Sequence, residues 1–236
     1  IFDKKVSLSN CKITNFEKAL KVGICESFKA SSLEISDISK KGFEIYDTNS
    51  VNLAGIVVEN VYTVIEANNS NISVNNSEFN NVQNAIMLKN LEFFTRYLTI
   101  ENCVNGISLD NCYSQIIDSR IVTEKIGLFY LNLLKRYPNY PIDYYQYLDQ
   151  KEIEGTSLVS IIYDTIIKSE IAIEIGSGEH NVAFKGLPPS GRIIHGGYFT
   201  DNIGSVKEIG KVLYIKSGKN TTEELNFETN KPNNVQ

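Results

Sequence analysis

The feature that most constrains the fold is a repeat of 21–23 residues in the first half of the chain. Asn60, Asn81 and Asn102 are each 21 residues apart, and Asn15 and Asp37 continue the series toward the N-terminus at spacings of 22 and 23. A unit this short cannot bury its own apolar face, so successive units must stack on one another. The repeat therefore predicts a solenoid built of coils.

Each repeat carries the same short apolar pattern. A small or short residue lies four or five positions after the polar residue that marks the repeat, and an apolar–any–apolar triplet follows. This alternation predicts a strand with one buried face. Residues that tolerate tight turns separate the strands, and no helical pattern of ten residues lies between them over residues 1–127. The small positions are Ala19, Gly42, Val64, Ala85, Gly106 and Gly127.

Parallel stacking would place equivalent residues of successive coils directly above one another. We expect the repeated Asn to form a ladder, in which each amide bonds the turn backbone of the next coil. We expect the small residue to give the chain room to bend sharply.

This pattern resembles the right-handed parallel β-helix of the pectate-lyase-like superfamily, and more narrowly the PbH1-repeat proteins, including the NosD-like group. The resemblance covers about residues 6–130 and 158–176. It predicts an all-β fold, with the β-helix over residues 1–176. A leucine-rich repeat is the alternative solenoid, but no LxxLxLxxN frame persists and the helical half of such a repeat is missing.

The repeat breaks after Gly127 and resumes near residue 158. We predict that residues 131–157 form a partly helical insertion between two coils. Insertions on one face of a solenoid often form its binding surface. Tyrosine can stack on sugar rings or anchor a protein partner, and the alternative left open is that the rings pack the insertion onto the β-helix. The predicted ligand-binding residues are Tyr137, Tyr140, Tyr144, Tyr145 and Tyr147.

The C-terminal segment, residues 177–236, has two strand-like stretches and a polar tail. The open end of a β-helix exposes strand edges that invite further pairing. We therefore predict that this segment forms a β cap.

The resemblance implies that an enzyme on this fold would act on a polysaccharide, as a lyase or a hydrolase. Alignment of the repeats places Glu78, Arg96, Asp118 and Arg120 in one candidate catalytic patch. It places Lys89 beside Asp110, where a solvated ion pair is the simplest interpretation. Three carboxylates do not occur on adjacent coils, so no metal site is predicted. Ca²⁺ is a possible cofactor only if the protein is a lyase, and no other cofactor is expected.

Composition narrows the classes of partner and location. The net charge of −5 argues against a nucleic-acid groove. No apolar run approaches the ~20 residues of a membrane span. The first residues lack the apolar region of a signal peptide, and the absence of an initial Met suggests a mature form or a fragment. The four cysteines leave open free thiols or disulfides between Cys103 and Cys112 or between Cys11 and Cys25.

Together these observations predict a secreted or cell-surface β-helix module. It would be non-catalytic and would present the Tyr-rich insertion to a polysaccharide or a protein partner. Two alternatives stay open at this stage, a polysaccharide-active enzyme and a structural spacer within a longer chain. A homo-oligomer is compatible with each of them.

Overall fold

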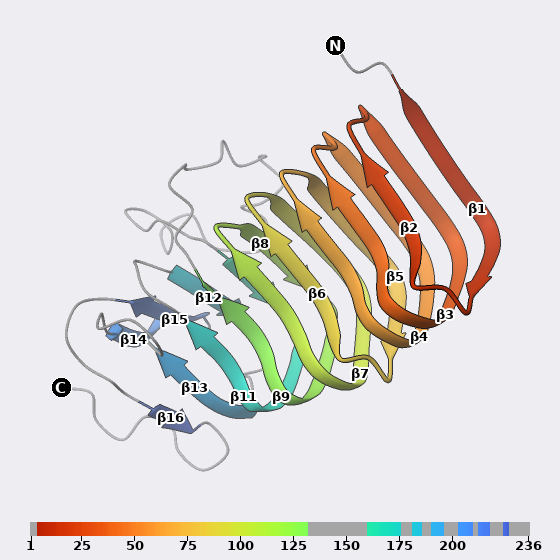
Figure 1. The fold of residues 1–236 in the computed structure, drawn as a ribbon. Helices are drawn as coiled ribbons and strands as arrows, with labels where there is room; N and C mark the ends of the chain where they lie inside the picture. The colour runs from red at the N-terminus through yellow and green to blue at the C-terminus, as the bar shows by residue number, and fades with distance from the viewer. Residues whose placement is uncertain are drawn as a thin grey trace.

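The computed structural model describes residues 4–131, 160–175, 181–185, 190–195, 203–209, 212–217 and 224–226. Over these residues the chain is all β, and it forms the predicted right-handed parallel β-helix. Figure 1 shows the coils stacked in chain order, from β1 at one end toward β12–β16 at the other. The first strands are β1 (Lys5–Thr14), β2 (Lys18–Gly23), β3 (Ser27–Tyr46), β4 (Ser50–Asn68), β5 (Asn71–Asn80) and β6 (Asn84–Lys89). Next come β7 (Glu92–Asp110), β8 (Tyr113–Ile117), β9 (Arg120–Tyr130), β10 (Ser160–Tyr163) and β11 (Ile166–Ile175).

Each coil has three straight faces that meet at three corners. At each corner one residue adopts the left-handed backbone conformation, which Asn, Asp and Gly tolerate better than other residues. The first corner has Asn10, Ser32, Gly55, Asn76, Tyr97 and Asp118; the second has Asn15, Asp37, Asn60, Asn81 and Asn102; the third has Ile24, Asp47, Asn69, Asn90 and Asn111. The face that precedes the first corner is called the first face. The second face lies between the first and second corners, and the third face lies between the second and third corners.

The predicted asparagine ladder is present, but its bonding partner differs from the prediction. Asn81 Nδ2 donates to Asn60 Oδ1 over 2.6 Å, and Asn60 Nδ2 donates to Asp37 Oδ1 over 3.0 Å. Asn102 Nδ2 donates to Asn80 Oδ1, beside Asn81, over 2.9 Å. Stacking of the coils brings these amides within reach of a side chain on the preceding coil, so the ladder runs between side chains rather than to the turn backbone. The third corner repeats the arrangement, with Asn111 Nδ2 donating to Asn90 Oδ1 over 2.7 Å.

The small residue of the repeat serves close approach of neighbouring coils rather than a bend. A Cβ added at Gly106 would meet the carbonyl oxygen of Gly127, and a Cβ at Gly127 would lie 2.7 Å from the carbonyl oxygen of Ala172. The backbone of each coil therefore passes close to that of the next at this position.

The core is a set of apolar columns that run through the stack. In one of them Ile65, Ile86 and Ile107 pair successively, and all are buried. All four cysteines are free thiols, which resolves the alternatives that the sequence left open. Burial raises the pKa of Cys103 to about 11 and that of Cys112 to about 12. These two thiols act as small core residues.

Among the described coils, the regular spacing is interrupted between β8 and β10. Ser114 pairs in register with Ser160, 46 residues later, where preceding coils are 21–23 residues apart. Tyr130, one residue before the last described residue of this part, is buried and donates to Ser160 Oγ over 2.8 Å. Burial raises the pKa of Tyr130 to about 12. The predicted insertion lies outside the described residues except for Leu131.

Pairing changes from parallel to antiparallel at the C-terminal end. β12 (Asn181–Lys185) pairs antiparallel with β15 (Val212–Ser217), which pairs antiparallel with β14 (Ile203–Ile209). β13 (Ser190–His195) pairs antiparallel with β16 (Glu224–Asn226). These antiparallel pairs lie in the segment for which the sequence predicts a β cap. Within the described part of the chain, no helix is long and apolar enough to cross a membrane.

Candidate ligand-binding trough on the third face

The residues of the predicted catalytic patch fall on two faces of the β-helix. Arg96, at the end of the first face, donates from Nε to Asp118 Oδ2 over 3.0 Å at the first corner. Arg120, on the second face, donates to Glu101 rather than to Glu78. Glu78 shares the column of Arg120, but Thr99 lies between them. The arginines therefore take part in two separate ion pairs.

These pairs have the character of surface salt bridges. The arginine side chains are about half exposed in both, so each pair is worth roughly 0–1 kcal/mol. The predicted pair of Lys89 and Asp110 is confirmed, with 3.0 Å between Nζ and Oδ2. Among the described residues, no three His, Cys, Asp or Glu side chains come together as a metal site.

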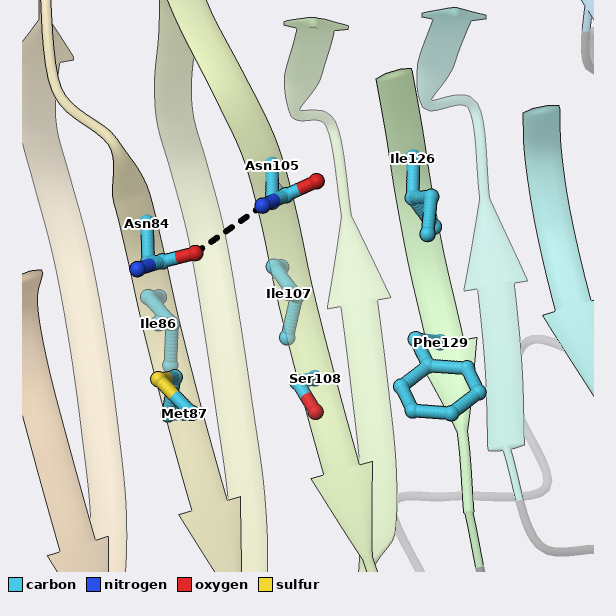
Figure 2. Close-up of a pocket in the computed structure, with 9 residues that line it drawn as sticks. Asn84, Ile86, Met87, Asn105, Ile107, Ser108, Ile126 and Phe129 are labelled. Carbon is cyan, nitrogen blue, oxygen red and sulfur yellow. Dashed lines mark hydrogen bonds between the residues drawn. The ribbon is translucent and has the colours of Figure 1, made fainter. Parts of the chain in front are cut away.

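A shallow trough lies on a different face, the third, across β3, β4, β6, β7 and β9. It consists of two adjoining hollows of about 220 and 390 Å³, and Met87 and Ser108 line both. The smaller hollow is also lined by Asn84, Asn105, Ile126 and Phe129 (Figure 2). The larger one is also lined by Tyr46, Glu66, Asn68, Lys89, Asp110 and Leu131.

The trough arises from unequal side chains in one outward-pointing column. Met87 pairs with Ser108, and Ser108 pairs with Phe129 on the next coil. A short serine between two long side chains leaves a hollow between them. Glu174 follows Phe129 in the same column, and burial raises the pKa of its carboxyl group. Backbone register therefore fixes the shape of the trough.

A second column supplies hydrogen-bonding groups to the same hollow. Asn105 Nδ2 donates to Asn84 Oδ1 over 3.0 Å, as Figure 2 shows. Each amide carries two N–H donors and a carbonyl oxygen with two lone pairs, so this bond uses only part of their capacity. Half-buried amides beside an aromatic ring and a serine hydroxyl can hold a ligand that has both hydroxyl groups and an apolar surface.

A charged network borders the larger hollow on the side of coil 2, residues 26–47. Glu44 accepts hydrogen bonds from Lys18 and Lys41, both over 2.9 Å, and these bonds lower the pKa of Glu44 to about 2. Lys41 also donates to Glu66 over 2.8 Å. Burial alone would lower the pKa of Lys41, but its bonds to Glu66 and Glu44 outweigh burial and raise it.

The network predicts a loss of stability in acid. Because the pKa of Glu44 is lower in the folded protein than its ordinary value of 4.5, its contribution is full above that value and is lost as the pH falls toward about 2. Glu44→Gln is expected to flatten this part of the pH dependence, measured as the urea midpoint of unfolding between pH 5 and 2. Lys18→Met removes the largest cause of the lowered pKa of Glu44 and should also flatten the pH dependence of stability. Superimposable profiles for wild type and Glu44→Gln would contradict the prediction.

The trough was not predicted from the sequence, because its lining residues differ in chemical type from coil to coil. A signal was present in the outward positions of the repeat, where Met87, Ser108 and Phe129 alternate long, short and long. The five predicted tyrosines lie outside the described residues. Leu131 is the first residue of the predicted insertion and lines the trough. Its backbone N–H donates to the Leu109 carbonyl over 2.9 Å.

Comparison of the chain with protein families, with curated proteins and with solved structures gives no match.

Proposed function

We propose that this protein is a non-catalytic glycan-binding module and that the trough on the third face holds the glycan. The observation that carries the proposal is the half-buried amide pair of Asn84 and Asn105 beside the Ser108 hollow, with Met87 and Phe129 on either side. Sugar rings combine hydroxyl edges with apolar faces, and this lining offers partners for both. Membership of the PbH1 group and a secreted or cell-surface location are part of this proposal.

The charges around the trough favour a neutral glycan. Lys89 is paired with Asp110, and Lys41 is paired with Glu44 and Glu66. A uronic-acid polymer needs cations that are available to its carboxylates, and these lysines already have carboxylate partners. The same pairing weighs against the lyase alternative, which needs Ca²⁺ or a cationic group at the sugar acid.

The Tyr-rich segment is proposed to extend the same surface. The chain reaches the rim of the trough at Leu131, six residues before Tyr137. Tyrosine rings would add stacking surface for a glycan. The trough and the tyrosines would then form one glycan-binding surface rather than two.

Affinity electrophoresis through gels that contain individual neutral polysaccharides tests the proposal. We expect retention by at least one of them, and Phe129→Ala should weaken it about tenfold, which corresponds to roughly 1.4 kcal/mol of lost ring contact. Ser108→Tyr should abolish retention because it fills the hollow. Thr99→Tyr, in the same strand but on the second face, is the matched control and should leave retention unchanged.

Parallel assays of the same samples separate the alternatives. Reducing ends and the ultraviolet absorbance of unsaturated products report hydrolase and lyase activity. Product formation that disappears in Asp118→Ala or Arg120→Ala would replace the binding proposal with an enzyme. Retention that persists in Ser108→Tyr but disappears when Tyr144 and Tyr145 become Ala would assign the ligand to the tyrosines alone. An absence of retention on every neutral polysaccharide would contradict the proposal.

A further inference from the structure

The chain has five sulfur-containing side chains, which are its four cysteines and a single methionine, Met87. Met87 points outward from β6, as Figure 2 shows, and is 40% exposed. Cys25, Cys103 and Cys112 are buried, and Cys11 is half-buried. Met87 is therefore the most exposed sulfur-containing side chain of the protein.

The cysteines are poor competitors for an oxidant. A thiol reacts with oxidants as its thiolate, and burial raises the pKa of Cys103 to about 11 and that of Cys112 to about 12. Both thiols therefore remain protonated at neutral pH. Cys25 is buried as well, and Cys11 lies on β1, outside the trough. A thioether has no proton to lose, so the oxidation of Met87 depends on its exposure and not on a pKa.

Met87 occupies the junction of the two hollows of the trough. It lines both of them, between Glu66 on one coil and Ser108 on the next. The Glu66 carboxylate accepts a hydrogen bond from Lys41 over 2.8 Å, and Phe129 pairs with Ser108 on the far side. The thioether therefore supplies apolar surface that the two hollows share, and a change in its chemistry affects the whole trough.

Oxidation would change Met87 from an apolar to a polar side chain. A peroxide transfers one oxygen atom to the sulfur. The O–O bond breaks and an S=O bond forms, so the sulfur loses two electrons and the peroxide is reduced to water or an alcohol. Ser108, the paired residue on the next coil, carries a hydroxyl that can donate a hydrogen bond to the sulfoxide oxygen. Such a bond would place polar groups in the hollow that the short serine leaves open.

We propose that Met87 is an oxidation site that controls ligand binding in the trough. Peroxides convert its thioether to the sulfoxide, which weakens binding, and reduction by a methionine sulfoxide reductase restores it. Preferential oxidation of Met87 follows from the exposure of the five sulfur-containing side chains, whereas the effect on binding rests on the proposed glycan-binding function.

Limited treatment of the full-length protein with hydrogen peroxide tests both parts of the proposal. Peptide mass spectrometry is expected to show one added oxygen atom on Met87 before any cysteine is modified. Affinity electrophoresis of the same samples, in the neutral polysaccharide that retains the untreated protein, should show binding weakened roughly five- to tenfold. Methionine sulfoxide reductase with a thiol reductant should restore retention. The thermal midpoint of unfolding should not change, because Met87 lies at the surface.

Three variants separate Met87 from the other groups. Met87→Leu removes the sulfur, and its retention, whatever its value before treatment, should be the same after peroxide. Met87→Gln introduces a polar side chain of similar length, so it should bind as weakly as the oxidised protein without any treatment. Cys11→Ser removes the least buried thiol and should lose retention on treatment as the wild type does.

The outcomes distinguish this proposal from the proposed function. Unchanged retention of protein whose Met87 is fully converted to the sulfoxide would overturn the control of binding, as would an equal loss in Met87→Leu after treatment. Modification of a cysteine ahead of Met87 would overturn the assignment of the oxidation site. If no polysaccharide retains the untreated protein, the proposed function fails and the control of binding fails with it, while mass spectrometry still decides whether Met87 is the preferred oxidation site.

Discussion

Replacing Phe93 with alanine is expected to lower the free energy of unfolding by about 3–5 kcal/mol. Phe93 is fully buried and pairs with Ile72 on one side and with Ser114 on the other, so its ring fills the core column of the first face. Truncation would leave a cavity that the neighbouring strands cannot close, because their hydrogen-bonded register holds them in place. The midpoint of urea unfolding should fall without a change in its slope.

The adjacent residue provides the control for this prediction. Phe94 has the same side chain, but it points outward, is half-buried and contacts Tyr113 edge to face at 6.2 Å between ring centres. Phe94→Ala is expected to cost about 1 kcal/mol. Since a register shift by one residue exchanges the two faces of a strand, equal costs for the two substitutions would contradict the strand orientation described above.

Gly127→Val is expected to destabilise the protein by about 3 kcal/mol, at the upper end of the cost of overpacking a core. The added Cβ would lie 2.7 Å from the Ala172 carbonyl oxygen and 2.8 Å from Ile167 Cγ2. The clash falls between two coils, so relief would require them to move apart and lose backbone pairing. Thermal unfolding monitored by circular dichroism measures the effect.

Gly55 is the matched glycine for this experiment. Its φ of +65° places it at the first corner, and the nearest atom to an added Cβ is 3.7 Å away. Asn76 adopts the same conformation at this corner in the next coil, with φ of 50°. Gly55→Asn should therefore change stability by less than about 1 kcal/mol. A cost as large as that of Gly127→Val would show that backbone conformation, and not space between coils, governs the glycines of this protein.

The sequence predicts the β-helix because inward-facing residues are under a common constraint. Ile65, Ile86 and Ile107 occupy one column, and each must pack on the next, so the same residue type recurs at the repeat distance. The corners recur for a second reason, since few residues tolerate the left-handed backbone. Both constraints act in every coil, and both are therefore visible as a period in the sequence.

The candidate site was less predictable because outward-facing residues are not constrained to be alike. Met87, Ser108 and Phe129 have no common chemistry, and only their place in the column brings them together. Column position was also insufficient to identify the partner of Arg120. Its long side chain reaches diagonally to Glu101 instead of along the column to Glu78, which alignment of repeats does not foresee.

The equal length of the middle coils has a consequence for how such a protein can change during evolution. Asn60, Asn81 and Asn102 mark units of 21 residues, and a tandem duplication of one unit would insert a complete coil with matching corners and core columns. Because the trough spans these coils, such a duplication would lengthen it by about 4.8 Å. The number of coils thus sets the length of the trough, which can change in fixed steps without a change of fold.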